Sequence, residues 1–428
     1  MKAKRNTINL ARLFLIFVCV LFNNTVSANE LSLEPLVEEA KRNNPEIAAA
    51  LKRYESAKAR IPQAKSPEDP QIGIEFEKAK GNPFNLRSTP AMDRKLSVSQ
   101  MFPWFGRLSL KGKIALVESQ IYAAEYKDKE LEVINATKKA YYDLFMSNKE
   151  ISLKQESLEF VKFVIKIAEA RYAAGGGSQN DIFKLNLELT KMNNEIENLE
   201  KEKSVKKVRL NSLLNRQADS YIGEPVLKEE IKELSYQADY LYKLTLQNQP
   251  ELLIFSYAIE KNKNEKELAK KSFFPDLMAG IVMRGLASGS IGPWDLMMAF
   301  SVPLWSWTKQ RYQVKEAIAN LEEAEAAYQA MKNKAFAETK NLIAKVEIAA
   351  NKVKLYKESQ IPLLQSSINS LVSSYRSGQA DIMLLIDSER MLIEARMDYY
   401  KSLVDYNMNL AELERNVGVD LSNPKERI

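Results

Sequence analysis

Apolar and polar residues alternate in four short stretches of this 428-residue chain, two in each half. The first pair lies within residues 70–102 and the second within 275–302, and a turn-rich loop separates the members of each pair. Alternation with a period of two is typical of β-strands with one apolar face, so each pair predicts a β-hairpin. The apolar positions include Ile72, Ile74, Phe76, Leu96, Val98, Leu277, Ala279, Ile281, Met283, Trp294, Leu296, Met298 and Phe300.

Aromatic residues gather just beyond the ends of these hairpins. Strands of about nine to ten residues can cross a bilayer when tilted, and aromatic girdles flank transmembrane strands. A pair of half-buried hairpins in a soluble protein is the alternative, and the aromatic clusters favour membrane strands. The predicted interface aromatics are Phe102, Trp104, Phe105, Trp305 and Trp307.

Four strands are too few for a closed barrel, because even small barrels need about eight. An open sheet in lipid would leave the backbone groups of its edges unpaired. We therefore expect the chain to oligomerise, and three copies that contribute twelve strands give the simplest closure.

After each hairpin the pattern becomes helical for a long distance, over residues 106–216 and 307–418. Apolar residues recur every seven positions on two nearly opposite faces, which predicts a supercoiled helix with a neighbour on each side. Glycines at 175–177 and at Gly378 divide each region into an outgoing and a returning helix, and Pro362 predicts a local kink. The two heptad series are Leu144, Ile151, Leu158, Ile165 and Tyr172, and Met146, Leu153, Phe160 and Ile167.

The two halves of the chain repeat one another. Asn44-Pro45-Glu46 returns as Gln249-Pro250-Glu251, each within a helical stretch (33–64 and 238–271) that precedes a hairpin. The two copies are 205 residues apart (Pro45 and Pro250). This distance far exceeds the roughly 20–50 residues of a solenoid unit, so it predicts a duplicated half-protein. The predicted divisions are a signal peptide at 1–28, a first repeat at 29–216, a connector at 217–234, a second repeat at 235–418 and a C-terminal tail at 419–428.

The first 28 residues are typical of a secretory signal, with a basic start, an apolar middle and small residues before a cleavage site after Ala28. The only cysteine, Cys19, lies in the apolar part, and the preceding Val18 is too large for a lipoprotein signal. We therefore expect no lipid anchor.

The composition excludes several kinds of chemistry. Histidine is absent and cysteine occurs once, so cysteine nucleophiles, histidine bases and zinc–thiolate sites are not expected. The 62 basic and 56 acidic residues are nearly balanced, which does not favour nucleic-acid binding. No segment is apolar for long enough to predict a transmembrane helix. We predict no catalytic residues, cofactor or metal site.

This duplicated order of elements resembles the TolC-like outer membrane factors, the exit ducts of tripartite efflux and secretion systems. The resemblance covers nearly the whole chain and is most specific at the hairpin ends. Arg171, Tyr172, Gly175, Ser178 and Asp181 fit the family pattern in the first half, and Tyr375 and Gly378, beside Arg376, fit it in the second. The sequence at 102–106 is most similar to the branch that serves heavy-metal efflux.

The resemblance implies a mainly α fold with a small membrane β part. Three chains would form a twelve-stranded β-barrel in the outer membrane, and their long coiled-coil hairpins would form an α-barrel in the periplasm. The hairpin ends would bind a periplasmic adaptor, beneath which lies an inner-membrane pump of the RND type. Conduction would be passive. The adaptor-docking candidates are Arg171, Tyr172, Gly175, Ser178, Tyr375, Arg376 and Gly378.

The family often carries two aspartates three residues apart at its inner constriction. In this chain Leu384 stands at the first position and Asp387 at the second. With Asp181 and Asp381, these residues are the candidates for a periplasmic constriction.

Other interpretations remain open from the sequence. A periplasmic adaptor or structural coiled coil would not enter the membrane, but an adaptor has one long helical hairpin where this chain has two. The glycine at each hairpin end could be an ordinary helix stop. Methionines in the strands could hold a soft metal, although methionine more often fills apolar positions.

Overall fold

The computed structural model describes residues 30–77, 93–227, 229, 231, 236–286, 292–419 and 421. The predicted signal peptide lies outside the described residues, as do parts of the strand loops, the connector and the tail. Among the helices that are described, none is both long and apolar enough to cross a membrane.

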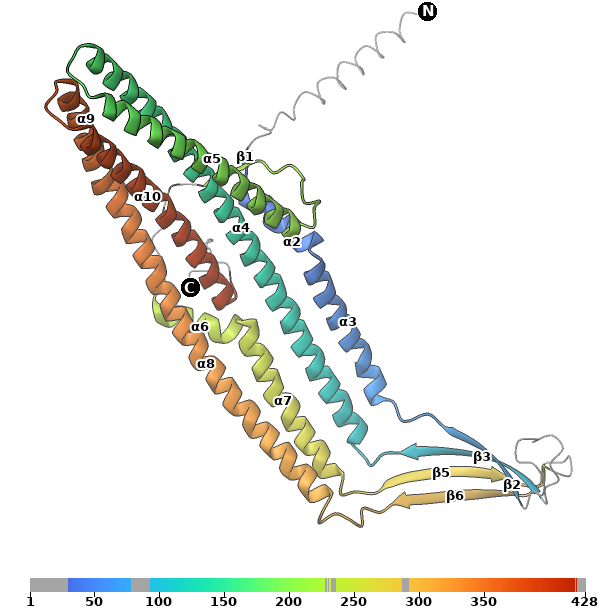
Figure 1. Ribbon diagram of the computed structural model, residues 1–428. Helices are drawn as coiled ribbons and strands as arrows, with labels where there is room; N and C mark the ends of the chain where they lie inside the picture. Colours follow the sequence, from blue (N-terminus) through green and yellow to red (C-terminus); the bar gives the residue numbers. More distant parts are fainter. Residues whose placement is uncertain are drawn as a thin grey trace, which may run out of the picture. The chain divides into compact units, whose positions relative to one another are not determined.

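The chain has the same order of elements twice, and it is mainly helical as predicted (Figure 1). A two-residue strand pair, β1 (Glu30–Leu31) with β4 (Glu224–Pro225), accompanies the first repeat. That repeat contains α2 (Leu33–Asn43), α3 (Pro45–Lys65), β2 (Gln71–Glu77), β3 (Asp93–Phe102), α4 (Arg107–Ala173) and α5 (Gln179–Leu213). The second contains α6 (Ala238–Asn248), α7 (Pro250–Lys271), β5 (Asp276–Met283), β6 (Trp294–Ser301), α8 (Gln310–Leu355), a π-helical turn (Tyr356–Gln360), α9 (Ile361–Arg376) and α10 (Ile382–Val417).

The compact units of the chain do not coincide with its two repeats. One unit, the tip unit, combines Met1–Asn44, Val133–Ser235 and Leu342–Leu413. The other, the sheet unit, combines Pro45–Glu132, Tyr236–Asn341 and Glu414–Ile428. Each unit therefore takes segments from both repeats.

Prolines set three helix boundaries. The helices expected over 33–64 and 238–271 are each interrupted at the residue before a proline, at Asn44 and Gln249. Both residues have extended backbone, with ψ near 120°, because proline disfavours the helical conformation of its predecessor. Pro45 and Pro250 then open α3 and α7, where a missing N–H costs nothing. Pro362 lies just after the π-helical turn, at the predicted irregularity.

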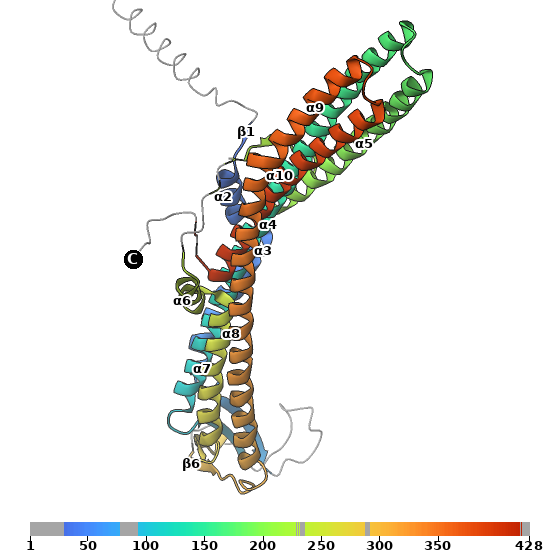
Figure 2. The same ribbon diagram turned by 90° about the vertical axis from the view of Figure 1, so that its left-hand side faces the viewer.

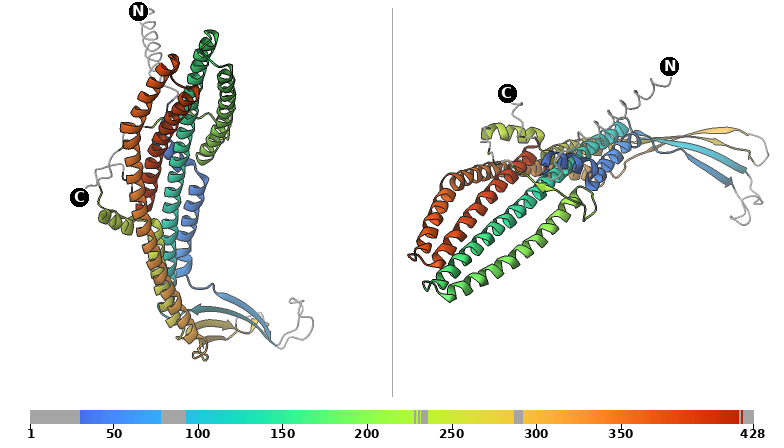
Figure 3. Two further views of the ribbon diagram at one scale, coloured as in Figure 1. Left: turned by 60° about the vertical axis from the view of Figure 1, so that its left-hand side comes forward. Right: turned by 90° about the horizontal axis from the view of Figure 1, so that it is seen from above.

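The core of the tip unit joins the four helices α4, α5, α9 and α10, which lie side by side in Figures 2 and 3. Lys154 of α4 pairs with Glu195 of α5, and Glu156 of α4 pairs with Arg396 of α10, so α4 contacts both helices. Members of both heptad series pack in the same cluster. Leu158 and Ile165 from one series lie in this core, and Leu153 from the other is also buried. The cluster contains Leu158, Val161, Val164, Ile165, Ala168, Leu185, Met192, Tyr375, Ile382, Leu385 and Ile386.

The sheet unit contains one antiparallel sheet with the strand order β2-β3-β5-β6. Its register aligns the predicted apolar positions across all four strands: Ile72 pairs with Val98, Val98 with Ile281, and Ile281 with Leu296. The sheet therefore has one continuous apolar face, which is largely exposed in the single chain. Strands β2 and β6 form its two edges. In the helical part of this unit, Leu252 at the start of α7 packs on Met331 and Ala335 of α8.

Candidate functional site at the hairpin ends and strand junctions

The first hairpin end is built on one glycine in the left-handed region. Gly175 has φ +80°, and its N–H donates to the Tyr172 carbonyl at 3.0 Å. The next residue donates to the Arg171 carbonyl at 2.9 Å, which closes the end of α4. Ser178 then caps α5, because its Oγ accepts the Asn180 N–H at 3.2 Å.

The second hairpin end repeats this construction 203 residues later. Gly378 has φ +82°, and its N–H donates to the Tyr375 carbonyl at 3.1 Å. Asp381 takes the place of Ser178, and its Oδ1 accepts the Met383 N–H at 2.7 Å. The structure therefore gives Asp381, a predicted constriction residue, the role of a helix cap.

The two hairpins are tied together at their ends by arginines. The Arg171 guanidinium lies over the Tyr375 ring, 4.7 Å from its centroid, and Nη2 donates to the Gly176 carbonyl at 3.0 Å. In the reciprocal direction Arg376 lies 5.5 Å from the centroid of Phe163. Such cation–π contacts contribute about 0.5–1 kcal/mol each where water is near.

The matching tyrosines of the two hairpin ends have different surroundings. Tyr172 is 47% exposed, whereas Tyr375 is only 3% exposed and belongs to the core of the tip unit. Burial raises the pKa of the Tyr375 hydroxyl, against the opposing effect of Arg171. The Tyr375 side chain therefore holds the hairpins together and does not present a docking surface, contrary to its place among the docking candidates. A Cβ on Gly175 would meet no atom within 4 Å, so that end is open.

The remaining constriction candidates lie close to the hairpin ends. Asp181 is in the first turn of α5 and is partly exposed. Leu384 and Asp387 lie nearly one turn apart on the exposed side of α10. Asp387 pairs loosely with Arg390 at 3.5 Å, and Arg390 also approaches Glu188 at 3.6 Å. The Asp387 side chain is 58% exposed, so its carboxylate is accessible to ions.

The predicted interface aromatics fall into two groups. Phe102, Phe105, Trp305 and Trp307 are exposed, as residues at a membrane surface would be. Trp104 instead stacks on Phe274, with the ring centroids 5.2 Å apart and the planes within 8°.

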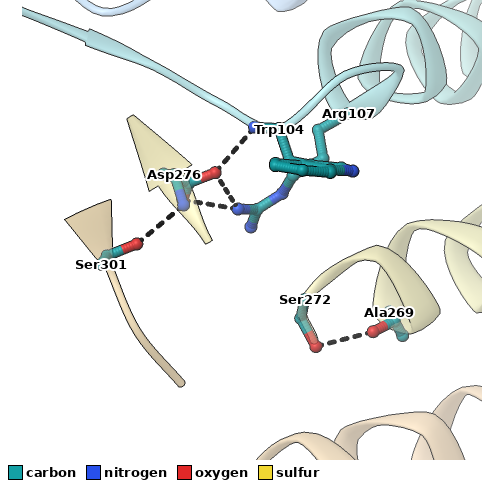
Figure 4. Close-up of polar contacts among 6 residues, drawn as sticks. All are labelled: Trp104, Arg107, Ala269, Ser272, Asp276 and Ser301. Carbon is teal, nitrogen blue, oxygen red and sulfur yellow. Dashed lines mark hydrogen bonds and ion pairs between the residues drawn. The ribbon is translucent and has the colours of Figure 1, made fainter. Parts of the chain in front are cut away.

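A carboxylate next to this stack links the strand–helix junctions of the two repeats (Figure 4). Asp276 accepts the backbone N–H of Trp104 at 2.8 Å and the Arg107 guanidinium at 2.6 Å, while its own N–H donates to Ser301 Oγ at 2.9 Å. The sequence pattern does not predict this ion pair between Asp276 and Arg107. Its one signal is an aspartate at the first position of an otherwise apolar strand.

The residues that the structure describes contain no group of three or more acidic, cysteine or histidine side chains that could hold a metal ion. What the chain has instead is a pair of helical hairpins and a four-stranded sheet with one apolar face. Residues 36–216 and 241–419, which together make up most of the chain, match the family described as outer membrane efflux protein.

The chain belongs to the outer membrane efflux protein family. It is 18% identical to Nodulation protein T of Rhizobium leguminosarum bv. trifolii over an alignment of 405 residues, and this alignment covers 91% of this chain and 86% of that protein. It is 19% identical over 383 residues to the pyoverdine export outer membrane protein OpmQ of Pseudomonas putida, covering 85% and 81%. Its fold is similar to that of the outer-membrane channel OprN, with a TM-score of 0.78, 17% identity and coverage of 91% and 90%.

Family membership confirms the predicted exit duct in the outer membrane, extending into the periplasm. The family and the similar folds are those of channels rather than enzymes. The predicted heavy-metal branch is not distinguished by these similarities, and the individual site residues stay predictions.

A buried carboxyl of the efflux protein lies in the tip unit between the two hairpins. Glu389 of α10 is 7% exposed, and its Oε2 accepts a hydrogen bond from Ser157 Oγ of α4 at 2.8 Å. Burial raises the pKa of Glu389, while the Ser157 hydrogen bond and the cations Lys154, Arg390 and Arg396 lower it less strongly. The nearby ion pair of Glu156 with Arg396 also joins α4 to α10.

The raised pKa predicts how Glu389 affects stability as the pH changes. The folded state binds the Glu389 proton more tightly than the unfolded state, so the residue destabilises the fold as the pH rises through its folded pKa. Below the ordinary glutamate pKa of about 4.3 this effect disappears. We expect Glu389→Gln to be more heat-stable than the wild type at neutral pH, with a difference that shrinks on acidification.

Melting curves of the detergent-solubilised protein between pH 4 and pH 8 test this expectation. Glu159→Gln is the matched control, because Glu159 is an exposed glutamate that pairs with Lys162. A Glu389→Gln difference that does not depend on pH would show that the carboxyl does not titrate as described.

Proposed function

We propose that three copies of this chain form a passive exit duct for a tripartite efflux system, with a twelve-stranded barrel in the outer membrane and a helical barrel in the periplasm. The observation that carries the proposal is the four-stranded sheet, whose apolar face and two open edges make it incomplete in lipid. Backbone groups that face hydrocarbon must be paired, so another chain has to supply strands to β2 and β6.

Two features support a partner at the hairpin ends. Gly175 and Gly378 hold both turns in a left-handed conformation that other residues rarely adopt, and they do so at matching positions. Tyr172 is exposed beside the first turn. We assign these ends to a periplasmic adaptor, which connects the duct to an inner-membrane pump of the RND type. In this proposal Arg171, Ser178 and Arg376 hold the turns in place for the adaptor, and Tyr375 stays in the core beneath them.

Two classes of transported substrate are proposed, small molecules and heavy-metal ions. OpmQ is described as a pyoverdine exporter, and a shared duct is compatible with export of such small molecules. The resemblance at 102–106 points to heavy-metal ions. The alternative of a periplasmic adaptor or a structural coiled coil has no support from the family, and neither does an enzyme.

The trimer can be tested by measuring particle mass. Because twelve strands close a barrel without edges, we expect light scattering of the detergent-solubilised protein to give three chains per particle after the detergent mass is subtracted. A folded, stable monomer would contradict the proposed assembly.

The docking role can be tested at the two glycines. Replacing Gly175 or Gly378 by leucine forces a side chain into a left-handed backbone, at a cost of about 1–2 kcal/mol. At Gly175 the new side chain enters open space, whereas at Gly378 its Cβ lies 3.4 Å from Arg171 Nη2. We expect both variants to lose most export in a deletion strain while their helix content and trimer mass stay near the wild-type values.

Gly176→Ala is the control for this experiment. Gly176 has no left-handed conformation, and the nearest atom to a Cβ there is 3.9 Å away, so this variant should export normally. Full export by both leucine variants would remove the docking role from the hairpin ends.

The role of Asp387 can be tested by conductance. If α10 faces the axis of the duct, three copies of Asp387 form an acidic ring that concentrates cations. We expect Asp387→Asn to weaken cation preference and to reduce block by trivalent cations added on the periplasmic side of a planar bilayer.

Glu159→Gln serves as the matched control here too. Like Asp387 it is an exposed acid paired with a base three residues away, but it lies on α4 and pairs with Lys162, whereas Asp387 lies on α10 and pairs with Arg390. Unchanged selectivity in Asp387→Asn would place that carboxylate on the outer wall.

A further inference from the structure

The segment that joins β6 to α8 and forms the start of that helix is basic, aromatic and exposed. Residues 305–316 contain three cations, three large aromatic residues and a single acid, Glu316. All six cations and aromatic residues are exposed in the single chain. They are Trp305, Trp307, Lys309, Arg311, Tyr312 and Lys315.

Short-range contacts keep these side chains together. The rings of Trp305 and Trp307 lie edge to face, with their centroids 6.0 Å apart. The Trp305 carbonyl accepts the Lys309 N–H at 2.8 Å, which folds the chain back into the helix. Arg311 and Lys315 are four residues apart in α8 and therefore share one face of it. The aromatic rings and the cations thus belong to one small patch of surface.

The charge of this patch is not neutralised within the chain. Lys309, Arg311 and Lys315 form no ion pair with any residue that the structure describes, and Lys315 only lies over the Tyr312 ring, 5.1 Å from its centroid. The junction of the first repeat differs, because there Arg107 pairs with Asp276 at 2.6 Å. The cations of the second junction are therefore free for an anion from outside the chain.

Helix stability does not explain these cations. The amino end of a helix carries a partial positive charge, so a cation in the first turn is unfavourable. The first turn of α8 contains Arg311 and no acid, whereas the helices that precede the hairpins, α3 and α7, open with Glu46 and Glu251. An anion bound beside α8 would remove this unfavourable interaction.

The neighbouring strand identifies the kind of anion. The alternation of β6 leads through the exposed apolar residues Phe300 and Val302 directly into the patch. Tryptophan and tyrosine gather at the headgroup level of membranes, and lysine and arginine beside a membrane attract anionic headgroups. A soluble anion would account for the cations alone, whereas an anionic phospholipid accounts for the cations and the exposed rings together.

We propose that Lys309, Arg311 and Lys315 bind the phosphate group of an anionic phospholipid, with Trp305 and Trp307 at the boundary between its headgroup and its acyl chains. This inference rests on the proposed function, because it requires the apolar face of the sheet to meet lipid. The lipid would hold the start of α8 at the periplasmic surface of the membrane.

Quenching of tryptophan fluorescence by brominated lipids tests the site. The chain has four tryptophans, so a Trp104→Phe/Trp294→Phe background leaves Trp305 and Trp307 as reporters. In phosphatidylcholine vesicles that contain the full-length protein, we expect brominated phosphatidylglycerol to quench more strongly than the same fraction of brominated phosphatidylcholine. A cation near an anionic membrane strengthens binding about fivefold, so each single change to glutamine should lower the preference by about that factor.

The decisive comparison uses two triple variants. Lys309→Gln/Arg311→Gln/Lys315→Gln should keep its trimer mass and lose the preference for phosphatidylglycerol. The matched control, Lys332→Gln/Lys334→Gln/Lys340→Gln, removes the same charge from the same helix, starting about 25 Å further along it, and should keep the preference. Lys332 lies over the Phe336 ring, as Lys315 does over Tyr312.

Three results would overturn the lipid site. They are a preference that persists in the junction variant, an equal loss in the control variant, and displacement of the brominated lipid by millimolar inorganic phosphate.

Particle mass and conductance separate this inference from the proposed function. A conducting trimer whose junction variant keeps the lipid preference would refute the lipid site and leave the duct intact. A protein that loses the preference only in the junction variant, yet forms no conducting trimer, would refute the duct and retain the lipid site.

Discussion

The unpaired edges of β2 and β6 are the constraint on which the proposed assembly depends. In lipid each unsatisfied N–H or C=O group costs several kcal/mol, so a sheet with one lipid-facing side cannot end in free edges. Four strands per chain make closure a property of several chains. The antiparallel register then decides which residues meet lipid, because side chains alternate between the faces of a sheet.

The duplicated repeats give the sheet two matching hairpins, but the polar contacts at the two hairpins differ. The repeats contribute one hairpin each, and β3 pairs with β5 where the hairpins meet. At that junction Asp276 links Trp104 and Arg107 of the first repeat to Ser301 of the second. The counterpart of Asp276 in the first repeat is Gln71, which has no charge. The junction within a chain is therefore ionic, and the equivalent position at the free edge is not.

Local patterns were sufficient to predict the strands and the long helical hairpins, but not the helix breaks before Pro45 and Pro250 or the surroundings of individual side chains. The alternation at Ile72 and Ile281 predicted the strands, and the proline at 45 and the glycine at 175 mark boundaries that depend on a few neighbouring residues. Tyr172 and Tyr375 stand at matching positions of the repeated pattern, yet one is exposed and the other buried. That difference depends on which helices pack around each tyrosine, and a single sequence does not contain this long-range information.

The polar pairs between the two repeats could not be predicted for the same reason. Glu389 and Ser157 are 232 residues apart, and Asp276 and Arg107 are 169 apart. Because the two residues of each pair are so far apart in the sequence, neither pair belongs to a short motif that can be recognised from the sequence. In the proposed trimer every residue occurs three times around one axis. Three copies of Asp387 then form a ring of carboxylates, and β2 of one chain pairs with β6 of the next at three places around the barrel. A chain with no histidine and one cysteine can in this way form selective surfaces from isolated side chains, because the symmetry of the assembly supplies the clustering.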